Sequence, residues 1–265
     1  MEKIIDTHSH LFEPEFADDL PEVIARAVDA GVSHICLPNI DASSIEAMLQ
    51  VCADYPTLCY PMIGLHPTSV KEDCRQELEE IHRWLSEPNH PFIAIGEVGL
   101  DLYWDRTYQK EQVEAFRQQI EWAITYKLPL VIHSRDAFEL LYSVLSDYRN
   151  SSLRGVFHSF TGNEEEARKL LTFDGFMLGV NGVLTFKKSP LPQSLLSVPL
   201  ERVVLETDSP YLAPVPNRGK RNETSYIRYT LSRLAEVYHA NEDEVALITS
   251  KNAIEVFNLR EKVVE

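Results

Sequence analysis

Residues 3–38 read KIIDTHSHLFEPEFADDLPEVIARAVDAGVSHICLP, and their pattern is the clearest indication of the fold class. Short apolar runs at 4–7 and 32–37 flank a segment whose apolar residues recur at helical spacing. Pro21 lies near the start of that segment and Gly31 just past its end, where helices favour these two residue types. The stretch therefore predicts a strand, a helix and a second strand.

The same alternation of apolar runs and amphipathic segments continues to the end of the chain. We expect strands at 4–7, 32–37, 58–63, 92–97, 130–133, 156–158, 176–180 and 203–208. We expect helices at 21–30, 41–53, 74–85, 108–126, 137–145, 164–171, 193–197, 224–239 and 242–257. The strands are continuous apolar runs, as in parallel sheets covered on both faces. The pattern predicts an α/β fold, a (β/α)8 TIM-type barrel, with a doubly wound open sheet as the alternative.

The length of the chain agrees with one barrel. A barrel of this type typically needs about 250 residues, and the chain has 265, so we expect one domain that covers residues 1–265. The long irregular stretch 209–222 is rich in Pro, Gly and Arg, and its length marks it as a functional loop.

Composition narrows the class of protein and its partners. The formal net charge of −16 argues against broad nonspecific binding to nucleic acid, which needs clustered Lys and Arg. It leaves room for a phosphate-bearing substrate, because charges are screened beyond about 8 Å at physiological salt. The four cysteines form no C-x-x-C pair, and we find neither a signal peptide nor a transmembrane run. We expect a cytoplasmic protein with reduced thiols and no membrane partner.

Polar residues gather where the predicted strands end. Five of the nine histidines follow predicted strands, together with two acids that lie at strand ends. Parallel barrels place their chemistry at the carboxyl ends of the strands, and a metal offsets the cost of burying such groups. These residues are His8, His10, His66, His133, His158, Glu97 and Asp208.

The spacing of His8 and His10 supports a metal site. Side chains two apart on a strand point to the same face, so both imidazoles face the barrel axis. Together with Glu97, His133, His158 and Asp208 they exceed the needs of one tetrahedral ion, and they suit two divalent ions about 3.5–4 Å apart. This mixture of imidazoles and carboxylates favours zinc or manganese, with magnesium also possible.

A set of motifs in fixed order resembles one family. DTHSH, GLHP, GEVGLDLYWD, HSRDA, HSFTG, ETDSPYLAP and RGKRNE extend over nearly the whole chain and closely resemble the TatD family of metal-dependent hydrolases and deoxyribonucleases, in the amidohydrolase superfamily. The chain departs from the family pattern at Thr224, where a Pro is usual, and at Ser9, where many members have Cys. The resemblance implies that the metal ligands are His8, His10, Glu97, His133, His158 and Asp208, with Glu97 bridging the two metals.

The implied activity is cleavage of DNA phosphodiester bonds by a water that two divalent metals activate. Asp208 is the expected catalytic residue, which takes the proton of the water and returns it to the leaving group. The expected substrate-binding residues are His66, Arg135, Arg218, Lys220 and Arg221, although His66 could instead structure its loop. Asp101 and Glu206 are expected to support ligands, and Tyr103 and Trp104 offer a stacking surface or merely cover the barrel rim.

Two other functions remain open at this point. The superfamily resemblance also allows a metal-dependent deacylase or amidohydrolase that acts on a small ester or amide, and the acidic charge gives this interpretation weight. A metal-stabilised scaffold without catalysis is the third hypothesis. A single barrel suffices for the site, so a monomer is compatible with each hypothesis.

Overall fold

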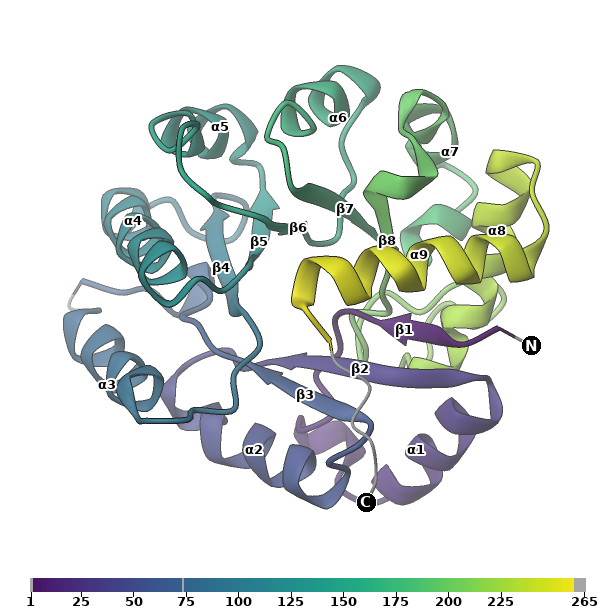
Figure 1. The fold of residues 1–265 in the computed structure, drawn as a ribbon, viewed down its shortest axis with the longest axis horizontal. Coiled ribbons are helices and arrows are strands. Elements are labelled where there is room, and N and C mark those ends of the chain that lie inside the picture. The colour runs from purple at the N-terminus through teal and green to yellow at the C-terminus, as the bar shows by residue number, and fades with distance from the viewer. Residues whose placement is uncertain (1, 73, 260–265) are drawn as a thin grey trace.

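The computed structural model describes residues 2–72 and 74–259. Within these residues eight strands alternate with helices along the chain, and each strand runs parallel to its neighbours (Figure 1). The strands are β1 (Ile4–Asp6), β2 (Val32–Pro38), β3 (Cys59–Met62), β4 (Ile95–Asp101), β5 (Leu130–Arg135), β6 (Gly155–Phe157), β7 (Phe176–Val180) and β8 (Val203–Leu205).

Backbone hydrogen bonds join the strands into a closed ring. β1 to β3 form one sheet and β4 to β8 another. Gly96 N donates to Ile63 O over 2.9 Å and links the two sheets on one side, while Thr7 N donates to Leu205 O over 3.0 Å on the other. The predicted (β/α)8 barrel is therefore confirmed, and the open sheet is not formed.

Helices surround the barrel and close one of its ends. They are α1 (Leu20–Asp29), α2 (Ile45–Asp54), α3 (Arg75–Ser86), α4 (Gln109–Tyr126), α5 (Phe138–Ser146), α6 (Glu164–Leu170), α7 (Leu191–Ser194), α8 (Ile227–Tyr238) and α9 (Glu242–Phe257). α9 lies across the end of the barrel that faces the viewer in Figure 1, where Ala253, Val256 and Phe257 pack against apolar side chains of the barrel interior. Among the helices described, none has the length and hydrophobicity that a membrane crossing requires.

Most strand boundaries differ from the prediction by no more than two residues, whereas those of β4 and β8 differ by more, and these two matter for the site. β4 was expected at 92–97 but runs over Ile95–Asp101, because its pairing with β5 shifts register between Ile95 and Val98 and then continues. Glu97 therefore lies inside a strand. β8 was expected to reach residue 208 but ends at Leu205, so Asp208 lies in the loop that follows.

Gly99 allows β4 to continue alongside β5. Its φ is +137°, and a Cβ atom at this position would overlap the carbonyl oxygen of His133. Only glycine combines this backbone conformation with so close an approach. The pairing of Gly99 with His133 fixes His133 beside the strand that carries Glu97.

Candidate metal centre

His8 and His10 project from an extended segment that follows β1. Backbone pairing continues there on both sides, since Ser9 N donates to Cys36 O over 3.1 Å and His10 N donates to Ser209 O over 2.7 Å. The chain therefore keeps the two-residue alternation of a strand past Asp6, and the two imidazoles point the same way, as expected from their spacing. Their Nε2 atoms lie 3.2 Å apart.

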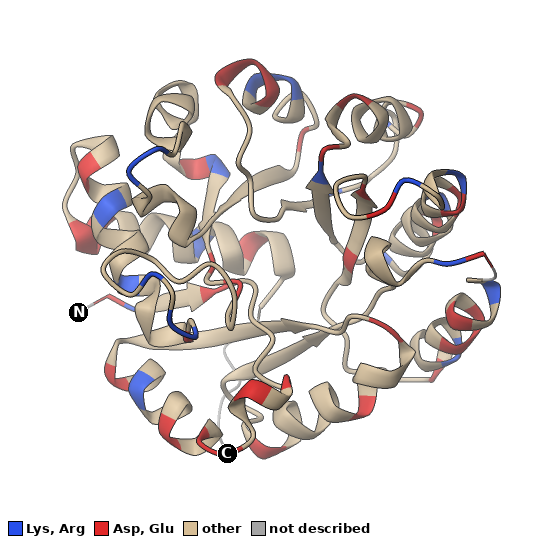
Figure 2. Cartoon of the chain, turned by 180° about the vertical axis from the view of Figure 1, so that it is seen from behind, with Lys and Arg blue, Asp and Glu red and all other residues tan. Residues whose placement is uncertain are grey.

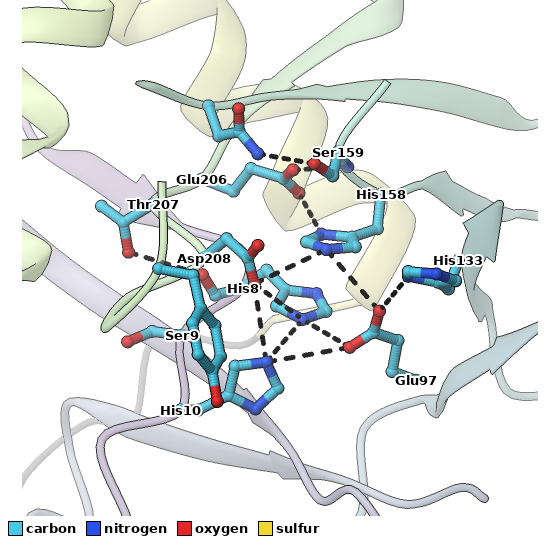
Figure 3. A network of polar contacts seen from close by, with 12 residues as sticks. His8, Ser9, His10, Glu97, His133, His158, Ser159, Glu206, Thr207 and Asp208 are labelled. Carbon is cyan, nitrogen blue, oxygen red and sulfur yellow. Dashed lines mark hydrogen bonds and ion pairs between the residues drawn. The ribbon is translucent and has the colours of Figure 1, made fainter. Parts of the chain in front are cut away.

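Glu97 lies at the centre of the cluster, buried among histidines (Figure 3). Its Oε2 atom is 3.0 Å from His8 Nε2 and 3.7 Å from His10 Nε2. Its Oε1 atom is 2.9 Å from His133 Nδ1 and 3.7 Å from His158 Nε2. The two carboxylate oxygens thus face two different sets of imidazoles.

Asp208 approaches the same space from the loop after β8. Its Oδ1 atom is 3.6 Å from His10 Nε2, 3.7 Å from His158 Nε2 and 3.9 Å from His8 Nε2. The residue has a φ of 58°, a left-handed conformation that aspartate adopts more readily than most residues. Its N–H donates to His8 O over 2.8 Å, which ties this turn to the segment that carries the first two histidines.

The donor atoms fit a divalent cation. Two nitrogen ligands of a tetrahedral zinc, each about 2.0–2.1 Å from the ion, stand about 3.3 Å apart, close to the 3.2 Å between His8 and His10. Burial and the nearby His158 lower the pKa of His8 to about 4, so its ring is neutral at pH 7 and keeps a lone pair to offer. Four imidazoles and two carboxylates around one space form a typical donor set for such ions.

Glu206 sets the orientation of His158. It accepts a hydrogen bond from His158 Nδ1 over 3.1 Å, which leaves Nε2 directed at Glu97 and Asp208, and a second from Ser159 N over 2.6 Å. Gly179 makes room for it, because a Cβ atom there would overlap the Glu206 carboxylate. Glu206 thus contacts a candidate ligand histidine, and the supporting role expected from the sequence stays a prediction.

Asp101 contacts His133 in a similar way. Its Oδ2 atom is 2.9 Å from His133 Nε2, while the opposite ring nitrogen faces Glu97. Burial opposes protonation of His133, but the hydrogen bonds to Asp101 and Glu97 outweigh it and raise the pKa to about 9. The other Asp101 oxygen accepts hydrogen bonds from the backbone N–H groups of Tyr103 and Trp104.

His66 presents a hydrogen-bond donor to the centre. Its Nδ1 accepts from Thr68 N over 3.2 Å, so in the neutral ring the proton resides on Nε2. That Nε2 is 3.3 Å from Glu97 Oε1. Burial lowers the pKa of His66, which favours the neutral donor form.

The four cationic side chains that were predicted to bind substrate do not lie together in the structure. A cavity of about 610 Å³ opens above Glu97 and Asp208, and Arg135 lines it. The three loop cations are not among its described lining residues. Arg221 is paired with Asp19 at 2.7 Å, and Arg218 stacks on the Phe186 ring at 3.7 Å. Of the four predicted cations, only Arg135 is among the described residues that line the cavity. Lys220, like Arg218 and Arg221, is not among them.

Asp6 is a structural acid that sequence reasoning missed. Its buried carboxylate accepts hydrogen bonds from Thr207 N over 2.9 Å and from Thr207 Oγ1 over 2.7 Å. Burial raises the pKa of Asp6 to about 7, although the hydrogen bonds from Thr207 oppose this rise. Asp6 joins β1 to the loop after β8, and it also accepts a hydrogen bond from His8 N over 3.3 Å. A charged residue in an apolar run, two positions before His8, is the signal that marks it in the sequence.

Comparison with known proteins identifies relatives over nearly the whole chain. The model of the family described as TatD related DNase matches residues 5–258. The chain is 36% identical to an uncharacterized metal-dependent hydrolase, YabD, of Bacillus subtilis strain 168, covering 97% of this chain and 99% of that one. It is 31% identical to the 3′-5′ ssDNA/RNA exonuclease TatD of Pectobacterium carotovorum, covering 97% and 100%.

A solved structure has the same fold. The crystal structure of YjjV, a TatD homolog from Escherichia coli K12, superposes with a TM-score of 0.90 at 28% identity. The match covers 97% of this chain and 98% of that one.

Proposed function

The chain belongs to the TatD-related DNase family of metal-dependent hydrolases, and from that premise we propose that it is a nuclease that hydrolyses phosphodiester bonds at single-stranded or frayed ends of DNA. One observation carries the proposal: the oxygens of Glu97 face two sets of histidines beneath a cavity that Arg135 also lines. Cations at this place, with an arginine beside them, would attract a phosphate oxyanion. The relative named as an ssDNA/RNA exonuclease supports nucleic acid as the substrate class.

Two divalent ions are part of the proposal. His8, His10, Asp208 and the Oε2 atom of Glu97 would hold one, and His133, His158 and Oε1 of Glu97 the other. Zinc or manganese suits these donors best, and magnesium would bind more weakly. When bound, the ions supply Lewis acidity, which polarises the phosphate and makes water a better nucleophile at neutral pH.

Asp208 is the proton acceptor in this scheme. Burial raises the pKa of its carboxyl, but the neighbouring His158, His10 and His8 outweigh burial and hold that pKa below its ordinary value. The carboxylate is therefore ionised at neutral pH, and its oxygen that does not hold the ion would take a proton from the attacking water. It then returns the proton to the oxygen of the departing nucleotide.

His66 and Arg135 would hold the phosphate. The Nε2–H of His66, which lies 3.3 Å from Glu97 Oε1 in the structure, would donate to a phosphate oxygen. Arg135 offers guanidinium donors from the wall of the same cavity. Both side chains neutralise or orient negative charge without taking part in proton transfer.

The test is hydrolysis of an end-labelled single-stranded oligonucleotide by metal-loaded protein, before and after chelation. We expect release of nucleotides that stops on chelation, and a loss of about 100-fold or more in Asp208→Asn at unchanged melting temperature. Asp54→Asn, which alters an exposed aspartate of α2, is the matched control and should retain full activity. Intact oligonucleotides combined with turnover of a small ester or amide would favour a deacylase. Equal behaviour of Asp208→Asn and the parent in every assay would favour a non-catalytic scaffold.

A further inference from the structure

Two large aromatic side chains stand exposed at the rim of the cavity. The side chain of Trp104 is 68% exposed and that of Tyr103 is 53% exposed. Both follow directly on β4, the strand that carries Glu97, and Trp104 lines the cavity itself. Exposed aromatic surface at the mouth of a polar site marks a place where a flat, partly apolar group binds.

Asp101 fixes this aromatic pair relative to the candidate metal centre. Its Oδ1 atom accepts hydrogen bonds from Tyr103 N over 3.0 Å and from Trp104 N over 3.2 Å. Its Oδ2 atom contacts His133 over 2.9 Å. The Asp101 carboxylate thus contacts both the candidate ligand His133 and the backbone of Tyr103 and Trp104. The Trp104 backbone is therefore positioned before any substrate binds.

Arg135 supports the pair from the neighbouring strand. Its guanidinium lies 3.9 Å from the ring centre of Tyr103 and 5.2 Å from that of Trp104, and the two rings meet edge to face. The cation covers Tyr103, which leaves Trp104 as the more open ring. No carboxylate of the described residues forms an ion pair with Arg135, so its N–H groups are available to a phosphate.

The opposite wall of the cavity is also partly apolar. Tyr211 is 46% exposed and Leu212 36%, and both line the cavity from the loop after β8. A cavity of about 610 Å³ has the size of a site for a small ligand or a single nucleotide, so we expect it to take one unpaired nucleotide rather than a base pair. A base that enters this space must already be unpaired.

We infer that Trp104 stacks on a nucleobase next to the scissile phosphate, and that Arg135 binds the phosphate attached to that nucleotide. The inference rests on the proposed nuclease function and specifies how the site selects single strands. Every base has a π face, so stacking tolerates any sequence. The site should therefore require an unpaired base at this position and discriminate little among the four bases.

The test is a double-mutant cycle in which one change is made in the protein and the other in the oligonucleotide. Binding is measured by fluorescence anisotropy in the metal-loaded, non-cleaving Asp208→Asn background, with Trp104→Ala and Trp104→Phe added. One oligonucleotide is natural, and the other carries abasic residues at its cleavable end. We expect Trp104→Ala to weaken binding of the natural strand by about 5- to 150-fold, and Trp104→Phe to retain most of the affinity. The abasic strand should bind Trp104→Ala as tightly as it binds the Trp104 parent.

The control and the contrary outcomes separate this inference from the proposed function. Tyr229→Ala removes an aromatic side chain of α8 that is 41% exposed, and it should bind as the parent does. If the wild-type protein cleaves oligonucleotides but Trp104→Ala binds them equally well, the stacking inference is wrong and the nuclease function stands. The same holds if Trp104→Ala weakens binding of the abasic strand equally. If the wild-type protein neither binds nor cleaves any oligonucleotide, both proposals fail.

Discussion

We propose that Glu206 supports the candidate metal centre through its hydrogen bond with His158. Burial opposes protonation of His158, but the charges of Glu206, Glu97 and Asp208 outweigh it and raise its pKa to about 10 in the chain without metal. The hydrogen bond from Nδ1 fixes which ring nitrogen faces the centre. In this proposal Glu206 sets both the orientation and the basicity of the candidate ligand His158.

We predict that Glu206→Gln weakens metal binding by about 10- to 100-fold, the range typical when such a supporting carboxylate is changed. Glutamine keeps the size of the side chain beside Gly179, so the fold should persist. Competition with a chromophoric chelator measures the affinity. Glu201→Gln changes an exposed carboxylate nearby and serves as the control. An affinity equal to that of the control would show that Glu206 does not act through His158.

Ion pairs with α1 and the residue before it hold the loop after β8 in place. Arg26 of α1 donates to both oxygens of Glu223, and Arg221 pairs with Asp19 just before the helix begins. The Glu223 side chain is only 7% exposed, whereas Arg26 is 44% exposed. These pairs fix the end of the loop that carries Asp208.

Glu223→Gln should lower stability in a pH-dependent way. Burial raises the pKa of Glu223, but hydrogen bonds from Arg26 and Ser225 outweigh burial and lower it below 4.5. The carboxylate therefore stabilises the fold at neutral pH, and this contribution disappears as the pH falls through 4.5 and then through the lowered folded-state pKa. We expect a loss of about 1 kcal/mol at pH 7, discounted for the exposure of Arg26, that shrinks toward zero in acid.

Urea unfolding at several pH values measures this difference. Glu236→Gln is the control, because it breaks an Arg–Glu pair on α8 in which the two side chains are 40% and 65% exposed. It should change stability by a few tenths of a kcal/mol at most. A Glu223→Gln effect that is the same at every pH would contradict the role assigned to its charge.

The close packing of Gly99 against β5 can also be tested by substitution. Gly99→Ala places a methyl group against the His133 carbonyl of β5, so we expect a loss of stability of several kcal/mol and displacement of His133. Gly219→Ala is a matched control. Its φ of +80° lies closer to the left-handed region that other residues adopt than the +137° of Gly99, and a Cβ atom there has no described atom within 4 Å, so Gly219→Ala should cost only about 1 kcal/mol. Equal losses in both variants, measured by thermal unfolding, would contradict a packing role for Gly99.

Across the whole molecule, acidic residues are distributed over the outer helices (Figure 2), so much of the net charge of −16 lies on the surface. The cavity is lined by Arg135 together with Glu97, Asp101 and Asp208, whose negative charges bound cations would offset. Arg135 sits at the mouth without an acidic partner among the described residues. We therefore expect binding of a strand to rely on a few local contacts, with a weak dependence on salt.

The sequence predicted the barrel because apolar runs and helical periodicity are local properties that repeat along the chain. It also predicted the residues around Glu97, because polar groups at strand ends meet at one face of a parallel barrel. It placed the end of β4 wrongly, because the register shift after Ile95 depends on contact with β5. The pairing of Arg221 with Asp19, about 200 positions apart, depends on the folded approach of α1 to the loop and has no local signal.

In the proposed site Glu97 lies between two cations. Anomalous diffraction from crystals grown with manganese or zinc would locate them. We predict two peaks, one among His8, His10, Asp208 and Oε2 of Glu97, and one beside His133, His158 and Oε1. The absence of any peak next to Glu97, with ordered metal elsewhere in the same crystal, would contradict the account.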